Sequence, residues 1–186
     1  MNLETLEYPP LTEDIEEAKN HLDKYGMALI ANVLSSDEID EMDQRLNEQF
    51  LGEEKYKVGS KVRGDEGLGL ESSEEEKVSR LVWNLINKGD CFLKLIDHPK
   101  ILPLIQHLIG EKVCLCSMGA HMNGSGNEKM ALHQDQWPLV PHPMDFPFMA
   151  NVMYLISDNS PENGGTRLIP GSHKWPLIDY RTANGE

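Results

Sequence analysis

The chain has 186 residues, enough for one domain with a hydrophobic core, and carries 31 acidic against 17 basic side chains, a net charge of -14. Because this charge repels nucleic-acid phosphates and anionic lipid surfaces, neither nucleic acid nor a membrane is expected as a partner. No apolar run has the roughly 20 residues of a spanning helix, the N-terminus lacks a secretory pattern, and the three cysteines are an odd number. The sequence therefore predicts a cytoplasmic protein with free thiols.

The first residues of the chain predict a helix, a strand and a second helix. Thr12 is expected to cap the first helix, whose apolar residues recur at near-helical spacing up to Gly26. Residues 27–34, MALIANVL, predict a strand. Ser35 and Glu38 have the spacing of a capping box, which predicts the start of the second helix.

The second helix is expected to end where a glycine- and charge-rich stretch begins. This stretch, residues 52–77, predicts a solvated loop, with a lid over a site as the alternative. Beyond it, residues 79–89 (SRLVWNLINKG) and 98–110 (HPKILPLIQHLIG) carry apolar side chains at helical spacing. Both predict helices, the second entered at His98 and stopped by Gly110.

After residue 110 the apolar period changes and predicts strands separated by glycine, proline and asparagine turns. The predicted strands are residues 112–123, the segment around residues 131–136, residues 148–157 and residues 166–170. Cys114 and Cys116 alternate within the first of these and are expected to be buried. Helices followed by strands predict an α+β fold with a mostly antiparallel sheet or barrel.

His133 and Asp135 are two apart in a stretch that is otherwise apolar and rich in proline. On a strand, residues i and i+2 point to the same face, so an imidazole nitrogen and a carboxylate oxygen could meet one metal ion. Roughly 0.45 such pairs are expected by chance in a chain of this composition. On residue type alone, a salt-bridged or capping surface pair therefore stays open.

The forty residues that follow this pair contain further motifs that bear on its interpretation. Residues 148–175, FMANVMYLISDNSPENGGTRLIPGSHKW, predict an apolar strand, a long turn and a second strand closed by a Pro-Gly-Ser-His motif. Together with the His133-Gln134-Asp135 motif, this segment resembles the phytanoyl-CoA dioxygenase family of iron(II)/2-oxoglutarate oxygenases. Residues 80–92 and 98–110 also resemble the helices that precede the barrel of that family.

The resemblance implies N-terminal helices packed on a double-stranded β-helix, a jelly-roll or cupin-like core that is incomplete in this chain. Residues 1–186 are then a single domain, with 1–110 mainly helical and 111–186 the first part of the barrel. The second histidine ligand of the family and its 2-oxoglutarate-binding arginine are expected beyond Glu186. The chain is accordingly expected to be the N-terminal portion of a longer enzyme.

The resemblance also implies the chemistry: iron(II) in a facial triad, 2-oxoglutarate as cosubstrate, dioxygen, and a small-molecule substrate whose identity stays open. Each expected site residue has an ordinary structural alternative, such as a surface arginine or a core aromatic. The expected residues are His133 and Asp135 for the metal, Arg80, Thr166 and Asn151 for the cosubstrate, and Trp137 for the substrate pocket.

The expected function is oxidation of a C-H bond, typically hydroxylation, with release of succinate and carbon dioxide. Three alternatives remain. One is a non-catalytic cupin-like module that binds a metal or another ligand. Another is a zinc hydrolase, although two protein ligands are fewer than the three that catalytic zinc usually has. The last is a degenerate family member that serves as an interaction module.

Overall fold

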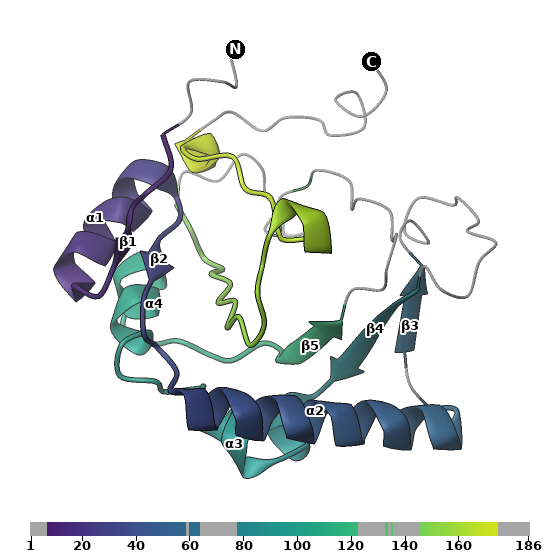
Figure 1. Cartoon of the computed structure of the whole chain (residues 1–186). Helices are drawn as coiled ribbons and strands as arrows, with labels where there is room; N and C mark the ends of the chain where they lie inside the picture. Colours follow the sequence, from purple (N-terminus) through teal and green to yellow (C-terminus); the bar gives the residue numbers. More distant parts are fainter. Residues whose placement is uncertain are drawn as a thin grey trace.

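A computed structural model describes residues 7–58, 60–63, 78–122, 133, 135 and 146–174. The predicted site residue Trp137 and most of the predicted loop at 52–77 lie outside these ranges. The elements, shown in Figure 1, are β1 (Leu11–Thr12), α1 (Ile15–Tyr25), β2 (Leu29–Ile30), α2 (Ser36–Tyr56), β3 (Ser60–Arg63), β4 (Val78–Trp83), η3 (Leu85–Asn87), α3 (Asp90–Leu93), α4 (Leu102–Ile109), β5 (Gly119–Met122), η4 (Pro161–Asn163) and η5 (Ser172–Lys174).

Helix α1 connects two very short parallel strands, β1 and β2. Its N-cap is Asp14, whose side chain accepts the backbone N-H of Glu17. The expectation that Thr12 caps this helix is wrong, because the Thr12 hydroxyl accepts the Asp14 N-H and donates to the Glu17 carboxylate from within β1. The strand predicted at 27–34 is reduced to the two residues of β2, which pair with β1.

Helix α2 begins as the sequence predicts. The Ser35 side chain accepts from the Glu38 N-H, and the Glu38 carboxylate accepts from the Ser35 N-H, which confirms the capping box. The helix continues past the glycine where its end is expected and stops at Lys57, which has left-handed backbone at φ 56°. Figure 1 shows α2 running below the three-stranded sheet.

Strands β3, β4 and β5 form an antiparallel sheet in that order. The helix predicted at 79–89 is wrong: residues 79–83 belong to β4, whose backbone pairs on both sides, with Arg80 opposite Lys61 and Met122, and Leu85–Asn87 form the short 3-10 helix η3. The apolar residues of this segment fit either period, and pairing with distant strands decides between them. Asn84, left-handed at φ 56°, then turns the chain into η3.

The hydrophobic core lies between α2, β4, η3 and α3. Its two most deeply buried large side chains are Phe92 of α3, 2% exposed, and Met42 of α2, 1% exposed. Leu34, Met118, Ala120, Tyr154 and Ile156 pack against this cluster from outside. The core therefore draws mainly on residues before 96, and the segment that carries the Pro-Gly-Ser-His motif contributes only at its edge.

Helix α4 confirms the predicted helix before Gly110, which accommodates a backbone φ of 94°. It starts later than expected, because the carbonyl of His98 accepts from the N-H groups of Ile101 and Leu102 in a turn that precedes the helix. His107 Nε2 lies 2.9 Å from Asp23 Oδ1 and joins α4 to α1. No helix within the described ranges is both long and apolar enough to cross a membrane.

The later part of the chain departs most from the predicted strands. Of residues 112–122, only β5 is a strand, and Cys114 and Cys116 are exposed, so their predicted burial in a strand is wrong. Residues 146–174 contain two short 3-10 helices and no strand. Strands need backbone partners, and the described residues supply none for these segments. A closed jelly roll is accordingly not present in the described part of the chain.

Candidate metal centre

His133 and Asp135 lie close together, although neither residue is in the strand that the sequence predicts there. Nε2 of His133 lies 3.1 Å from Oδ1 of Asp135, and the two side chains are 42% and 54% exposed. An imidazole nitrogen and a carboxylate oxygen thus converge at a point that is open to solvent. A hydrogen-bonded ion pair would have the same separation, so the distance alone does not select between the two interpretations.

The spacing of these two atoms suits a shared metal ion. Two donor atoms with metal bonds of about 2.1 Å at a right angle are about 3.0 Å apart. The observed 3.1 Å is close to that value. One nitrogen and one oxygen donor also match part of the ligand set that ferrous iron has in a two-histidine, one-carboxylate site. The residues present therefore fit a ferrous ion, with further ligands needed to complete it.

Asn151 adds a contact that the sequence does not predict. Its side-chain amide Nδ2 donates to Oδ2 of Asp135 at 2.6 Å, from a residue 16 positions further along the chain. The Asp135 carboxylate therefore faces His133 with one oxygen and Asn151 with the other. The only signal for Asn151 in the sequence is that it is a polar residue in an apolar stretch.

The segment that carries Asn151 is held on the core by Tyr154. The Tyr154 hydroxyl donates to the Leu95 carbonyl at 2.9 Å, and partial burial raises the pKa of Tyr154 to about 12. Tyr154 and Ile156 are half-buried against the core, whereas Met153 and Leu155 are 56% and 53% exposed. This alternation is typical of an extended chain and places Asn151 on the side that faces away from the core.

Arg80 lies in β4 and not in a helix, contrary to the sequence-based expectation. One guanidinium nitrogen is 3.4 Å from Oε1 of Glu54 on α2, and both side chains are partly exposed. An exposed pair of this kind stabilises the fold by about 0–1 kcal/mol, so Arg80 can leave Glu54 at little cost. Its role toward a cosubstrate stays a prediction.

Two further site residues are predicted from the sequence, Thr166 and Trp137. Thr166 is exposed and follows η4, and its proposed contact with the cosubstrate stays a prediction. Trp137 is outside the described residues, and its place in a substrate pocket also stays a prediction. Within the described ranges, no group of three His, Cys, Asp or Glu side chains is arranged to hold a metal ion.

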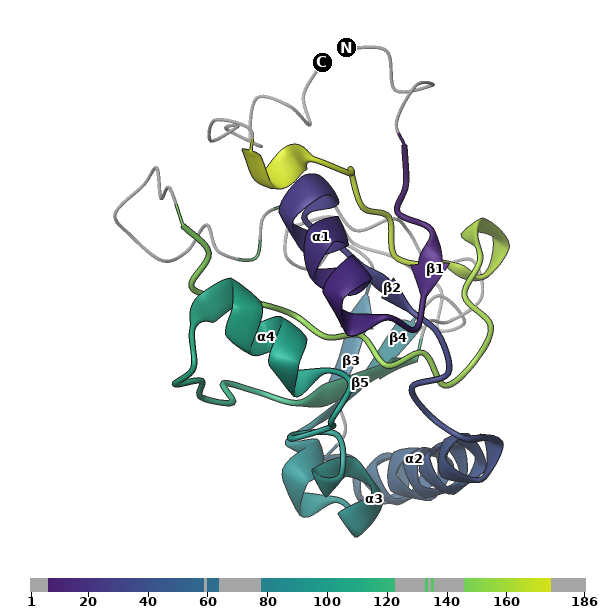
Figure 2. The same cartoon turned by 90° about the vertical axis from the view of Figure 1, so that its left-hand side faces the viewer.

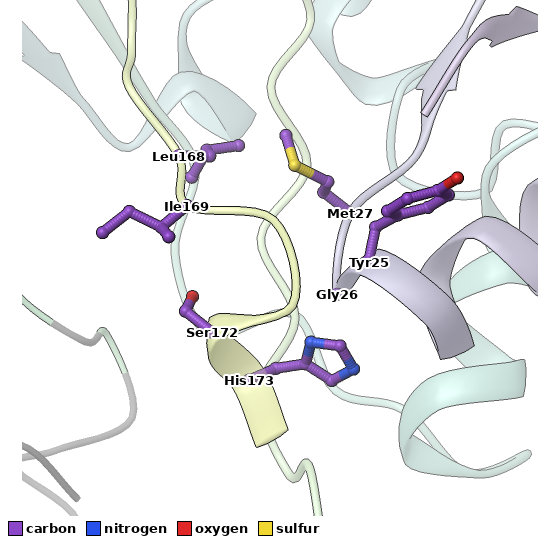
Figure 3. Close-up of a pocket in the computed structure, with 7 residues that line it drawn as sticks. All are labelled: Tyr25, Gly26, Met27, Leu168, Ile169, Ser172 and His173. Atoms are coloured by element: carbon purple, nitrogen blue, oxygen red, sulfur yellow. The ribbon is translucent and has the colours of Figure 1, made fainter. Parts of the chain in front are cut away.

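A small pocket lies between the end of α1 and the Pro-Gly-Ser-His turn, and none of the predicted site residues is among those that line it (Figure 3). Its volume is about 60 Å³, and small-molecule sites usually have about 300–1,000 Å³. The His173 ring lies against Gly26, and its Nε2 is 3.3 Å from the Asp23 carbonyl. Figure 2 shows this C-terminal segment over the end of α1, where Gly171 N-H donates to the Tyr25 carbonyl at 2.7 Å. The pocket is a packing feature of this junction.

Comparison with known proteins identifies the family of the chain. The family model for phytanoyl-CoA dioxygenase (PhyH) matches residues 22–184. The chain belongs to the phytanoyl-CoA dioxygenase family. The matched range contains the His133-Gln134-Asp135 motif, Asn151 and the Pro-Gly-Ser-His turn.

Three curated relatives extend the comparison. Dioxygenase af480 of Aspergillus fumigatus is 30% identical, over 89% of this chain and 51% of its own length. A probable alpha-ketoglutarate-dependent hypophosphite dioxygenase of Stutzerimonas stutzeri is 27% identical, over 89% and 56%. Dioxygenase sphC of Aspergillus fumigatus is 24% identical, over 88% and 46%. The chain thus spans about half the length of these relatives. No solved structure gives a significant match.

Proposed function

We propose that His133 and Asp135 hold a ferrous ion and that the protein oxidises a C-H bond of a small molecule with dioxygen and 2-oxoglutarate. The observation that carries this proposal is the 3.1 Å approach of Nε2 to Oδ1 in a chain of the phytanoyl-CoA dioxygenase family. The relative from Stutzerimonas stutzeri, whose name specifies alpha-ketoglutarate, supports the choice of cosubstrate.

The residues have separate tasks in this proposal. His133 offers a neutral nitrogen and Asp135 an anionic oxygen, which together bind a divalent ion and neutralise half of its charge. When bound, ferrous iron supplies the dioxygen and electron-transfer chemistry, which side chains alone cannot provide. The net reaction converts 2-oxoglutarate, dioxygen and the C-H substrate to succinate, carbon dioxide and the hydroxylated product. A third protein ligand is proposed from outside the described residues.

Cosubstrate and substrate would lie beside the metal pair. Arg80 is proposed to grip a carboxylate of 2-oxoglutarate, because a guanidinium presents paired N-H donors to a carboxylate. Thr166 is proposed to donate its hydroxyl to the same cosubstrate, and Trp137 to form a wall of the substrate pocket. The exposed Met153 and Leu155, which alternate in the same register as Asn151, offer apolar surface for the substrate.

The test is metal binding and succinate formation in His133→Ala and Asp135→Ala. The chain provides matched controls: His107 and Asp23 also pair through Nε2 and Oδ1, at 2.9 Å, but lie on α4 and α1. We expect both site variants to lose Mn²⁺ affinity at least about 100-fold and to form no succinate, because they lack a direct ligand. His107→Ala and Asp23→Ala should keep both properties.

The experiment is run on this chain and on any longer product of the same gene. Wild-type affinity in both site variants would contradict the proposal. Metal binding without succinate formation in every protein would favour the non-catalytic cupin-like alternative.

A further inference from the structure

We propose that Asn151 is a positioning residue that fixes the Asp135 carboxylate so that only Oδ1 is presented to the metal ion. This inference rests on the proposed function, because it assigns a task at the same site. Its basis is the amide contact from Nδ2 of Asn151 to Oδ2 of Asp135 at 2.6 Å, which complements the approach of His133 Nε2 to Oδ1 at 3.1 Å.

The two contacts engage different oxygens of the Asp135 carboxylate. A carboxylate that binds a metal through both oxygens must turn both toward the ion, whereas Oδ2 of Asp135 already accepts the Asn151 amide. The distance is at the short end for an N-H donor, as expected when the acceptor carries a charge. With Oδ2 engaged in this way, ligation through Oδ1 alone is the favoured arrangement.

Ligation through a single carboxylate oxygen determines how many coordination positions of the metal ion stay open. A six-coordinate ion with three protein donor atoms has three positions left, which is the number that a bidentate 2-oxo acid and dioxygen require. A carboxylate that used both oxygens would occupy one of them. By holding Oδ2, Asn151 would keep that position available.

The surroundings of Asn151 make it suited to this task and unimportant for folding. It is exposed, so its amide is not needed to fill the core. Its backbone is held three residues away, where Tyr154 donates to the Leu95 carbonyl and packs on the core. An exposed amide on an anchored segment can direct a ligand without stabilising the fold.

The test compares Asn151→Leu, which keeps the approximate volume but has no donor, with Asn47→Leu on α2. Asn47 makes the same kind of contact, Nδ2 to Oδ2 of Asp43 at 3.1 Å, and is also exposed. Mutation of a residue that hydrogen-bonds a metal ligand typically lowers the metal affinity by about 10–100-fold. We expect a loss of that size in Mn²⁺ affinity for Asn151→Leu, and none for Asn47→Leu.

A second pair of variants separates the effect of losing the amide donor from the effect of changing the shape of the side chain. Gln and Met have similar length, so Asn151→Gln retains an amide donor that Asn151→Met lacks. Asn151→Gln is expected to bind Mn²⁺ more tightly than Asn151→Met. This pair also decides the matter if Asn151→Leu lowers the melting temperature.

The outcomes distinguish this inference from the function on which it rests. Wild-type affinity in Asn151→Leu and equal affinity in the Gln and Met variants, with binding lost in Asp135→Ala, would overturn the positioning role and leave the metal centre in place. Absence of Mn²⁺ binding in the wild-type protein would overturn both.

Discussion

The core around Phe92 and the segment at 146–174 differ in what holds them. The core is built from one face of α2, β4, η3 and α3, and the apolar side chains on that face are almost fully buried. The later segment has no strand, exposes several large apolar side chains, and is attached through a few contacts such as Tyr154 to Leu95 and Gly171 to Tyr25. Stability is therefore concentrated in the first region, and the candidate chemistry lies in and beside the second.

The largest effect should come from the core. Phe92→Ala removes a side chain that is 2% exposed and should lower the free energy of unfolding by about 3–5 kcal/mol. Leu93→Ala, at a neighbouring position that is 42% exposed, should change it by less than about 1 kcal/mol. Urea unfolding followed by circular dichroism measures both. Equal losses in the two variants would mean that the core is not where stability is concentrated.

The junction between the regions should be the next most sensitive place. Gly26 has φ +74°, and a Cβ there would overlap Nδ1 of the His173 ring. Gly26→Ala should therefore cost about 2–4 kcal/mol, from left-handed backbone strain and displacement of the His173 ring. Gly52→Ala is the control, because a Cβ at that position of α2 meets nothing within 4 Å. It should stabilise by about 0.5–1 kcal/mol. Thermal melts that gave both changes the same sign would contradict this account of the junction.

A smaller effect is expected where the later segment meets the core. Tyr154→Phe removes the donor to the Leu95 carbonyl and should cost about 1–2 kcal/mol of unfolding free energy. Tyr56→Phe, at a residue that is 70% exposed, should have almost no effect. If Tyr154→Phe melts like the wild type, the hydroxyl does not anchor the segment that carries Asn151.

From the raised pKa of the Tyr154 hydroxyl we predict that the stability of the protein depends modestly on pH. Burial raises the pKa of Tyr154 from 10.0 to about 12. Because the folded pKa is the higher one, this contribution is fully present below pH 10 and is lost as the pH rises toward 12. The melting temperature of the wild type should fall more steeply over this range than that of Tyr154→Phe. Parallel curves would show that Tyr154 does not titrate differently in the two states.

Local signals in the sequence predict some helix ends correctly and miss others, such as the cap of α1 and the end of α2. The Ser35-Glu38 capping box and the stops at Gly26 and Gly110 depend on a few adjacent residues, and the structure confirms them. The segment at 79–89 is misassigned as a helix because its apolar residues suit both periods, and pairing with β3 and β5 determines that residues 79–83 are a strand. Long-range pairing of this kind is not encoded in a local pattern.

The contrast between local and long-range contacts also applies to the candidate metal centre. The approach of His133 to Asp135 joins residues two apart, so it is a local contact, although neither residue is in the strand on which the prediction relied. The contact from Asn151 to Asp135 joins residues 16 apart, and it depends on how the later segment lies on the core. The sequence identifies Asn151 as a candidate but assigns it to the cosubstrate, which remains a separate prediction.

The most direct measurement is an anaerobic titration of this chain, and of any longer product of its gene, with iron(II) and 2-oxoglutarate. A 2-oxo acid bound through two oxygens to ferrous iron gives a visible metal-to-ligand charge-transfer band. We predict this band in the wild-type protein and in His107→Ala, and its loss in His133→Ala and Asp135→Ala. A folded wild-type protein without the band in either form, or a band that persists in both site variants, would contradict the proposed metal centre.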